Sequence, residues 1–195
     1  MIVKNESAII IRLLESVTPL IDSYCICDTG STDNTITLIQ KYCESKNIPG
    51  KIIEESFRDF GYNRSYALMG CTDMQNADYI LLMDADMKLE IKTTNIEQFK
   101  RMLINDAYYV VQGCPDFFNE NIRIIRNDPS YHYWGVTHEY IELPDTAVIE
   151  NISKDVLFIT DVGDGGSKEN KFKRDIELLI KGLEMNPNNP RYLFY

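Results

Sequence analysis

The fold of this chain is decided by Tyr79-Ile-Leu-Leu-Met-Asp-Ala-Asp-Met-Lys88, an apolar run that ends in two carboxylates one residue apart. A short apolar run with polar sequence on both sides predicts a strand buried on both faces, as in a parallel sheet covered by helices. Asp84 and Asp86 then lie at the carboxyl end of the strand, where open α/β sheets bind their ligands. Two carboxylates at such an edge suit Mg²⁺ or Mn²⁺, which in turn bind diphosphates. Asp-x-Asp is also a common turn sequence, so the segments upstream of Tyr79 are needed to decide whether Asp84 and Asp86 form a ligand site.

The sequence before Tyr79 alternates between strand and helix patterns. Short apolar segments predict strands at residues 2–3, 24–27 and 51–54. Helix patterns lie between them, at residues 6–17, on the face shared by Ile36, Ile39 and Cys43, and at residues 62–71. Strands that alternate with helices form right-handed βαβ units. We therefore expect an α/β fold with a mainly parallel central sheet, flanked by helices, and a ligand site at its carboxyl edge.

After Asp86 the alternation stops. A predicted helix at residues 95–104 is followed by strand-like segments at residues 107–112, 122–126, 140–143 and 156–159. Since no helix pattern separates these segments, we expect this half to be mixed or antiparallel. Residues 163–166 predict a loop, and from Lys171 the apolar spacing is helical as far as Asn186. We expect one domain over residues 1–165 and a helical extension over 166–195.

The composition restricts the class of protein. A chain of 195 residues with 44% hydrophobic content can bury a core of one domain plus a small appendage. Its net charge of -10 argues against nucleic acid or an anionic membrane as a partner. No apolar run approaches the length of about 20 residues that a membrane span requires, and the N-terminus lacks the apolar core of a signal peptide. We therefore expect a cytoplasmic protein whose five cysteines are reduced core residues.

Five motifs occur in one order along the chain, at residues 1–6, 28–33, 63–68, 84–86 and 134–139. Each is weak alone, but together they make the chain resemble the family 2 glycosyltransferases of the GT-A fold, over nearly its whole length. The resemblance is to the branch that carries tetratricopeptide repeats after the catalytic domain, because residues 178–195 look like the join between two such repeats. A lone repeat cannot bury its apolar face, so we expect the natural protein to continue beyond Tyr195.

The resemblance implies a nucleotide-sugar donor and assigns residues to it. It places Asp28, after the second strand, near the nucleotide base, and Glu6 in the same pocket. Many relatives have a second Asp directly after the first, where this chain has Thr29. Asp33 is better explained as the cap of the helix that it precedes.

Arg64 matches the basic residue of the family that faces the nucleotide. A guanidinium there can bind phosphate oxygens in an otherwise acidic protein. The alternative is a surface ion pair with Asp59 or Glu55.

The resemblance implies a cofactor, Mn²⁺ or Mg²⁺, that bridges the two phosphates of the donor. Asp84 and Asp86 are its expected ligands, with Asp86 the direct one. Members of this branch often have a His before the linker, where this chain offers Asp161 or Asp164 as an oxygen ligand or as part of a turn. His138 is a further candidate for a metal or phosphate contact, and a buried structural histidine is an equal alternative.

An inverting transfer needs a base that takes the proton from the acceptor hydroxyl. Glu139 matches the position at which relatives carry an acidic residue. One alternative makes Glu139 a structural partner of Arg123 or Arg126. Another assigns the base to Asp116 or Asp145, each next to a proline on an expected loop.

Three functions compete on the sequence. The resemblance implies a metal-dependent, inverting hexosyltransferase that uses a nucleotide-sugar, with a UDP-sugar favoured, and an acceptor of unknown identity. A catalytically inactive nucleotide-sugar-binding or repeat-scaffold module is the first alternative, with protein contacts through the helical tail. A nucleotidyltransferase is less favoured, because residues 4–7 are not a Gly-rich, Lys-bearing loop.

Overall fold

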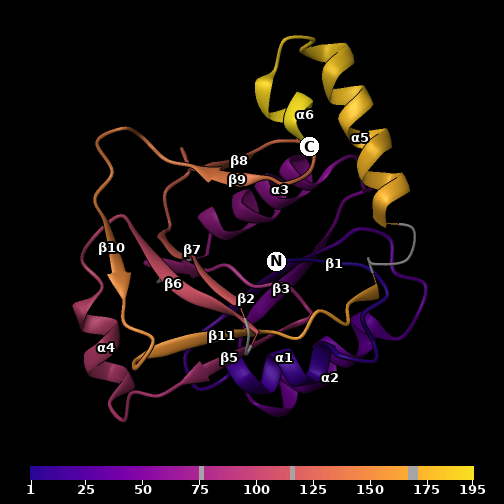
Figure 1. Ribbon diagram of the computed structural model, residues 1–195. Coiled ribbons are helices and arrows are strands. Elements are labelled where there is room, and N and C mark those ends of the chain that lie inside the picture. The colour runs from indigo at the N-terminus through magenta and orange to yellow at the C-terminus, as the bar shows by residue number, and fades with distance from the viewer. Residues whose placement is uncertain (75–76, 115–116, 167–170) are drawn as a thin grey trace.

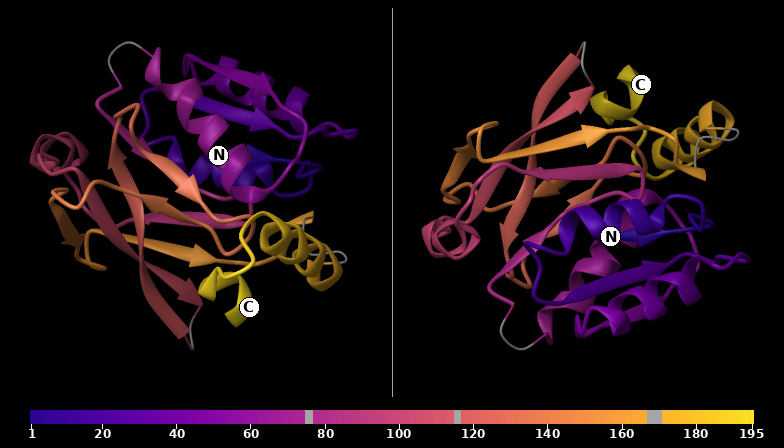
Figure 2. Two further views of the ribbon diagram at one scale, coloured as in Figure 1. Left: turned by 90° about the horizontal axis from the view of Figure 1, so that it is seen from above. Right: turned by 90° about the horizontal axis from the view of Figure 1, so that it is seen from below.

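The chain folds into an α/β structure with two main sheets that lie side by side (Figure 1). The computed structural model describes residues 1–74, 77–114, 117–166 and 171–195. Figure 2 shows, in both views, the indigo-to-purple N-terminal half on one side of the molecule and the later strands on the other.

The N-terminal half forms a three-stranded parallel sheet of order β1-β2-β3. Its elements are β1 (Ile2–Val3), α1 (Ile10–Val17), β2 (Tyr24–Asp28), α2 (Thr35–Ser45) and β3 (Gly50–Glu54). Helix α1 buries Ile10, Leu13, Leu14 and Val17, the spacing of one helical face. It begins four residues later than expected, and a turn in which the Glu6 carbonyl accepts from the backbone N–H groups of Ile9 and Ile10 precedes it. The alternating strands and helices predicted for this half are confirmed.

The second half is a mixed sheet of order β4-β7-β6-β11-β5, with β10 paired to β6. The bounds are β4 (Tyr79–Leu81), β5 (Met87–Ile91), β6 (Ala107–Cys114), β7 (Phe117–Arg126), β10 (Ile149–Ile152) and β11 (Leu157–Asp161). Helix α4 (Ile96–Met102) connects β5 to β6. The mixed character of this half is confirmed, although β5 and β10 were not predicted.

One expectation about pairing is wrong. The Tyr79 strand was expected to extend the parallel sheet, but β4 pairs antiparallel with β7, Ile80 opposite Ile125. The reason is the long β6–β7 pair, whose Ile122, Ile124 and Ile125 give β4 an apolar partner of matching register. Burial of an apolar run therefore identified the strand correctly without revealing its direction.

The strand that leads to Asp84 is buried between two hydrophobic clusters, as predicted. Leu81 and Met83 pack in the larger cluster, with residues of α1, α2 and β11. Ile80 and Leu82 pack in the second cluster, with Leu68, Ile125 and Tyr131. Since successive side chains of a strand point to opposite faces, this short run joins both clusters.

A hairpin of β8 (His132–Trp134) and β9 (Tyr140–Glu142) lies beside α3 (Phe60–Thr72) (Figure 1). The Ser65 hydroxyl donates to the Tyr133 carbonyl at 3.3 Å and accepts from the Tyr133 N–H at 2.9 Å. Helix α3 begins at the cap Asp59, whose carboxylate accepts from the Tyr62 N–H. These contacts position the helix that carries Arg64.

The C-terminal helices α5 (Lys171–Met185) and α6 (Pro190–Phe194) pack on the end of this hairpin (Figure 1). Leu178, Leu179 and Tyr192 form a cluster with Val136. A side chain at Gly182 would collide with the Tyr192 ring, because its Cβ would lie 2.8 Å from that ring. The apolar face expected at Ile176, Leu179, Ile180 and Leu183 is only partly covered, with Ile176 57% and Ile180 53% exposed.

Over the described residues, no helix is both long and apolar enough to span a membrane.

Candidate active site

A cleft of about 610 Å³ lies at the carboxyl ends of β1 and β4. Most of the residues singled out in the sequence line it, and they come from distant segments. These are Glu6, Arg64, Asp84, Asp86, His138 and Asp161. The structure therefore brings together the first, third, fourth and fifth sequence motifs.

Arg64 joins two of the predicted site carboxylates. Its Nη1 lies 2.6 Å from Asp84 Oδ1, and its Nε donates to Glu139 Oε1 at 2.5 Å. Neither Asp59 nor Glu55, the partners in the alternative prediction of a surface ion pair, pairs with Arg64. The Arg64 side chain is 16% exposed, so the ion pairs are largely shielded from water. Such pairs cost far more to break than surface pairs, because a broken pair leaves a buried charge behind.

Arg123 provides a second positive charge for Asp84. Its Nη1 lies 3.5 Å from Asp84 Oδ2, while its Nε donates to Gln112 Oε1 at 2.6 Å. Burial by itself would raise the pKa of Asp84, but the charges of Arg64 and Arg123 outweigh burial and lower the pKa to about 2. Asp84 therefore stays ionised and is bound on both oxygens by arginines.

Asp86 has a different environment from Asp84. Its backbone carbonyl accepts from the Val162 N–H at 3.1 Å, which holds it beside the end of β11. A Cβ at Gly165 would lie 3.2 Å from Asp86 Oδ2, so the loop passes close to this carboxylate. Asp161 pairs with Met87 across the ladder and also lines the cleft. Asp86, just before β5, and Asp161, at the end of the adjacent β11, thus line the same cleft.

Glu6 adds a buried carboxylate to the cleft. It is 7% exposed, and its Oε2 accepts from the Gly166 N–H at 3.1 Å. Burial raises the pKa of Glu6, and the charges of Asp86, Asp33 and Asp164 raise it further. The cleft therefore accumulates negative charge that a bound cation would offset.

Asp28 binds its own turn. Its carboxylate accepts from the backbone N–H of Gly30 at 3.2 Å and from the N–H and hydroxyl of Ser31 at 3.0 and 2.5 Å. Gly30 has a φ of 103°, which a side chain would disfavour. Of this turn, Thr29 lines the cleft. Asp33 was expected to cap α2, but the N-cap residue is Asn34, whose side chain makes no capping hydrogen bond. Asp33 instead accepts from the backbone N–H groups of Thr35 and Ser7 and so joins the turn before α2 to the one after β1.

The C-terminal extension forms part of the cleft wall. Lys171 and Arg174 of α5 line it. The Tyr195 ring stacks on His138 at 3.8 Å between centroids, and Arg191 Nη2 donates to the His138 carbonyl at 2.6 Å. His138 has a φ of 50°, a left-handed conformation that is rare outside glycine and asparagine. Spacing in the sequence did not predict that the extension would reach the site.

The other alternative residues lie elsewhere. Asp164 forms a bidentate pair with Arg12, at 2.8 and 2.6 Å. Arg126 lies near Asp106 rather than Glu139, and Asp145 is exposed. Neither Asp145 nor Glu139 lines the cleft, but Glu139 is joined to it by its ion pair with Arg64, which does. Asp116 lies outside the described residues.

The part of the chain described by the structure contains no group of three or more His, Cys, Asp or Glu side chains arranged to hold a metal ion. Mg²⁺ is often bound by one or two carboxylates together with substrate phosphates, rather than by a complete protein cage. The carboxylates of Asp86 and Asp161 fit that kind of site, since both are hard oxygen donors in a cleft of negative charge. Asp84 fits it less well because arginines already bind its oxygens.

Arg123, Lys171 and Arg174 are site residues that the sequence analysis missed. Arg123 was considered only as a partner of Glu139, and its pair with Asp84 depends on the β4–β7 pairing. The one available signal was charge: an Arg in an apolar strand pattern needs a carboxylate nearby.

The sequence model of the family described as glycosyl transferase family 2 matches residues 1–160. The glycosyltransferase SunS of the SPbeta prophage in Bacillus subtilis is 25% identical over the whole chain, which covers 46% of that protein. A TPR repeat-containing protein of Synechococcus elongatus is 24% identical over 73% of the chain, equivalent to 34% of its own length. The chain thus spans less than half the length of these relatives.

Among solved structures, S. aureus TarS in complex with UDP-GlcNAc aligns with 93% of this chain and 65% of its own, at a TM-score of 0.58 and 15% identity. TarS in complex with UDP aligns at a TM-score of 0.55. At this identity the similarity shows the fold, and it agrees with the expected GT-A architecture.

Proposed function

Since this chain belongs to glycosyl transferase family 2, we propose that it transfers a sugar from a UDP-sugar to an acceptor hydroxyl, with a divalent cation and inversion at the sugar. The observation that carries the proposal is the cleft itself. It gathers Asp86, Asp161, Glu6 and Arg64 at the carboxyl edge of an α/β fold. Its volume of about 610 Å³ lies within the range of about 300–1,000 Å³ that is usual for ligand pockets.

The donor is proposed to lie along this cleft with its nucleoside near Glu6 and the turn that Asp28 organises. Thr29 of that turn and Glu6 both line the cleft. Asp28 acts in this arrangement by holding the turn through Gly30 and Ser31. UDP is favoured because TarS, which shares the fold, binds UDP and UDP-GlcNAc.

Asp86 and Asp161 would hold Mn²⁺ or Mg²⁺ against the diphosphate of the donor, with His138, which also lines the cleft, as a further contact. When bound, such a cation stabilises the charge of the departing nucleoside diphosphate. Asp84 then has a positioning role, because it fixes the guanidinium of Arg64. Lys171 and Arg174, the latter paired with Asp175, add positive charge to the lining of the cleft, where they can bind phosphate oxygens.

Glu139 is proposed as the base. Arg64 Nε binds Oε1, and no other described residue forms a hydrogen bond with Oε2, which can accept the proton of an acceptor hydroxyl. Arg64 also orients the carboxylate, which favours a defined geometry of attack.

Calorimetry with UDP tests the donor and cation roles together. We expect UDP to bind in the presence of Mn²⁺ and to lose at least about tenfold in affinity when EDTA replaces the metal or when Asp86→Ala removes its ligand. Asp73→Ala is the matched control, since Asp73 is an exposed carboxylate paired with Lys51 and is not a cleft residue. Equal UDP affinity of Asp86→Ala and the parent, both with Mn²⁺, would refute the metal role of Asp86.

The second candidate is a binding module without transfer activity. The pairing of Glu139 with Arg64 favours it, because a carboxylate held by a buried guanidinium can serve to position that arginine without taking up a proton. Incubation with UDP-sugars and Mn²⁺ separates the two functions: release of UDP indicates a transferase, whereas binding without release indicates a module.

The helical extension is proposed to begin a repeat of the tetratricopeptide type, with residues 1–165 as the catalytic domain. The capped turn between α5 and α6 and the exposed Ile176 and Ile180 are in keeping with a surface for further protein contacts. A cytoplasmic location stays a prediction from the sequence.

A further inference from the structure

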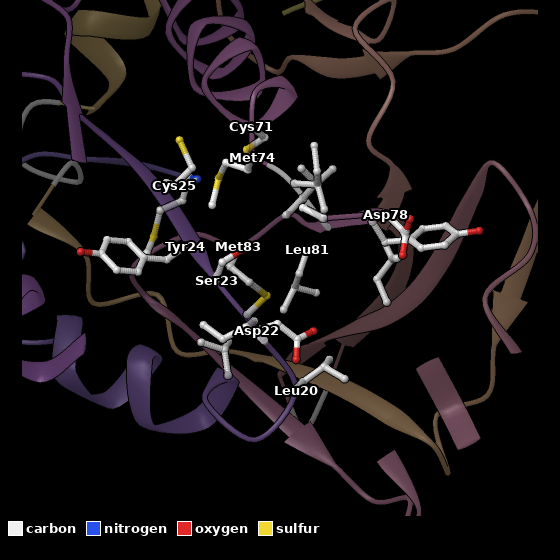
Figure 3. A pocket seen from close by; sticks show the side chains of 18 of the residues that line it. Leu20, Asp22, Ser23, Tyr24, Cys25, Cys71, Met74, Asp78, Leu81 and Met83 are labelled. Atoms are coloured by element: carbon white, nitrogen blue, oxygen red, sulfur yellow. Dashed lines mark hydrogen bonds between the residues drawn. The ribbon is translucent and has the colours of Figure 1, made fainter. Parts of the chain in front are cut away.

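A second pocket, of about 420 Å³, lies near the amino-terminal end of β4, away from the carboxyl edge (Figure 3). Its wall is mostly apolar, with Leu20, Leu81 and Met83 among its residues. Two cysteines from different elements also line it: Cys25 of β2 and Cys71 of α3. Figure 3 shows Cys25, Cys71 and Met74 together on one side of the pocket, across from Leu20 and Asp22.

The two thiols meet at one backbone oxygen. Cys25 Sγ lies 3.7 Å from the Ala67 carbonyl oxygen, and Cys71 Sγ lies 3.5 Å from the same oxygen. Helix α3 can approach β2 this closely because residue 70 is glycine: a Cβ there would lie 2.8 Å from Cys25 Sγ. Both cysteines are free thiols. The packing of α3 on β2 thus places two thiols side by side at a pocket wall.

The two thiols differ in acidity. The pKa of Cys25 is lowered to about 7, chiefly by a hydrogen bond from the Cys71 thiol. The positive charges of the Met1 amino group and Lys51 lower it as well, whereas burial and the negative charge of Asp73 act to raise it. The same hydrogen bond raises the pKa of Cys71, as does its burial. A half-exposed thiol with a lowered pKa beside a second thiol is the arrangement found in redox-reactive cysteines.

We propose that Cys25 and Cys71 form a redox-active dithiol that hydrogen peroxide converts to a disulfide between β2 and α3. The Cys25 thiolate attacks one peroxide oxygen. A sulfur–oxygen bond forms, the oxygen–oxygen bond breaks, and the departing hydroxide takes up a proton to give water. Cys25 is then a sulfenic acid, with its sulfur oxidised by two electrons.

Cys71 completes the reaction. Its sulfur attacks the Cys25 sulfur, a disulfide bond forms, and the hydroxide released from Cys25 combines with the proton from the Cys71 thiol as a second water. The chief cause of the raised Cys71 pKa is the Cys25 thiol itself, and oxidation of Cys25 removes that cause. Two thiols and one peroxide thereby give one disulfide and two waters.

The site goes beyond sugar transfer, yet it lies on the helix that carries Arg64. Arg64 also lines this pocket, on the side toward the cleft. A disulfide between β2 and α3 would fix the helix on the strand. The dithiol is therefore placed to link peroxide exposure to the position of Arg64.

The test uses the full chain in a Cys114→Ser background, which removes the exposed thiol on β6. The reduced protein is treated with hydrogen peroxide, the remaining thiols are alkylated, and peptides are mapped by mass spectrometry. We expect a cross-linked peptide that joins Cys25 to Cys71, reversed by dithiothreitol. Cys27 serves as an internal control, because burial raises its pKa to about 11 and it should stay reduced.

A second variant traps the intermediate. In Cys71→Ser, checked for folding by circular dichroism, Cys25 should accumulate sulfenic acid that dimedone labels, since the second thiol is absent. In Cys25→Ser, Cys71 should stay reduced. Two results would overturn the proposal: both thiols remaining fully alkylatable after peroxide treatment of the Cys114→Ser protein, or a disulfide that joins Cys25 to a residue other than Cys71.

Discussion

Strand β4 (Tyr79–Leu81) and the segment that continues it to Asp84 begin and end in opposite environments. At its start lies the apolar pocket, bordered by Leu, Met, Tyr and Cys side chains. At its end lies the cleft, where Asp84 is bound by Arg64 and Arg123. Only the segment from Tyr79 to Asp84 separates these two regions.

The difference shows that neighbouring residues of one short segment have different roles: the apolar ones stabilise the fold, and the charged ones are available for ligand binding. Leu82 and Met83 bury apolar surface, worth about 2 kcal/mol each. The ion pairs that follow them contribute little net stability, because removing charges from water cancels most of the attraction. Charges at this edge therefore have their main value in binding, while the apolar residues hold the strand in place.

The largest effect is expected at the charged end. Arg64→Ala leaves Asp84 and Glu139 without their main partner, so we expect a loss of about 3–5 kcal/mol in the free energy of unfolding, measured with urea. UDP binding should be lost as well. Leu82→Ala at the apolar end should cost a comparable amount, about 3 kcal/mol, through the cavity that it creates. At urea concentrations too low to unfold it, however, the Leu82→Ala variant should bind UDP with the affinity of the parent.

Arg58→Ala is the matched control for Arg64→Ala. Arg58 is 61% exposed and pairs with Glu55 just before α3, so its loss should cost at most about 1 kcal/mol. If Arg64→Ala were no less stable than Arg58→Ala, the claim that the buried ion pairs of Arg64 are more costly to break than a surface pair would be wrong.

The next effect concerns turnover. Glu139→Gln keeps the shape of the side chain and its oxygen toward Arg64, so we expect near-parental UDP affinity and a sugar-transfer rate lower by about a hundredfold, the usual scale for loss of a general base. Melting temperature, UDP affinity and UDP release are measured on one sample. Full transfer activity would remove Glu139 as the base, whereas a joint fall in stability, affinity and rate would make it a positioning partner of Arg64.

The smallest effect is a dependence of stability on pH. The pKa of Asp84 is lowered to about 2 in the folded protein, below the value of about 3.9 for an unfolded Asp. Its ionised form therefore stabilises the fold above about pH 4, and this contribution, about 2 kcal/mol, is lost as the pH falls from about 4 to about 2. The free energy of unfolding, measured with urea at several pH values between 5 and 2, should fall less steeply with falling pH for Asp84→Asn than for the parent.

Asp73→Asn tests whether this slope is specific to the charged end of the strand. The pKa of Asp73 is also lowered, by its hydrogen bond with Lys51, but the pair is on the surface and screened by solvent. If Asp73→Asn reduced the pH dependence of the free energy of unfolding as much as Asp84→Asn does, burial of Asp84 beside Arg64 and Arg123 would not be the cause of that dependence.

The sequence by itself determined the α/β class, the parallel first half and the buried strand that ends in Asp84. These features depend on local spacing of apolar residues and on turn residues, which any window of the chain displays. The order of motifs also indicated the family and six of the residues that line the cleft, but not Lys171 or Arg174.

Only the tertiary structure decided which charges meet. Arg64 and Glu139 are 75 residues apart in the sequence, and the Arg123–Asp84 pair follows from the antiparallel β4–β7 register. The same applies to Tyr195 on His138 and to Cys25 beside Cys71, which depend on how a helix packs. Spacing along the chain encodes the face of each element, but the partner of a side chain is set by packing between elements.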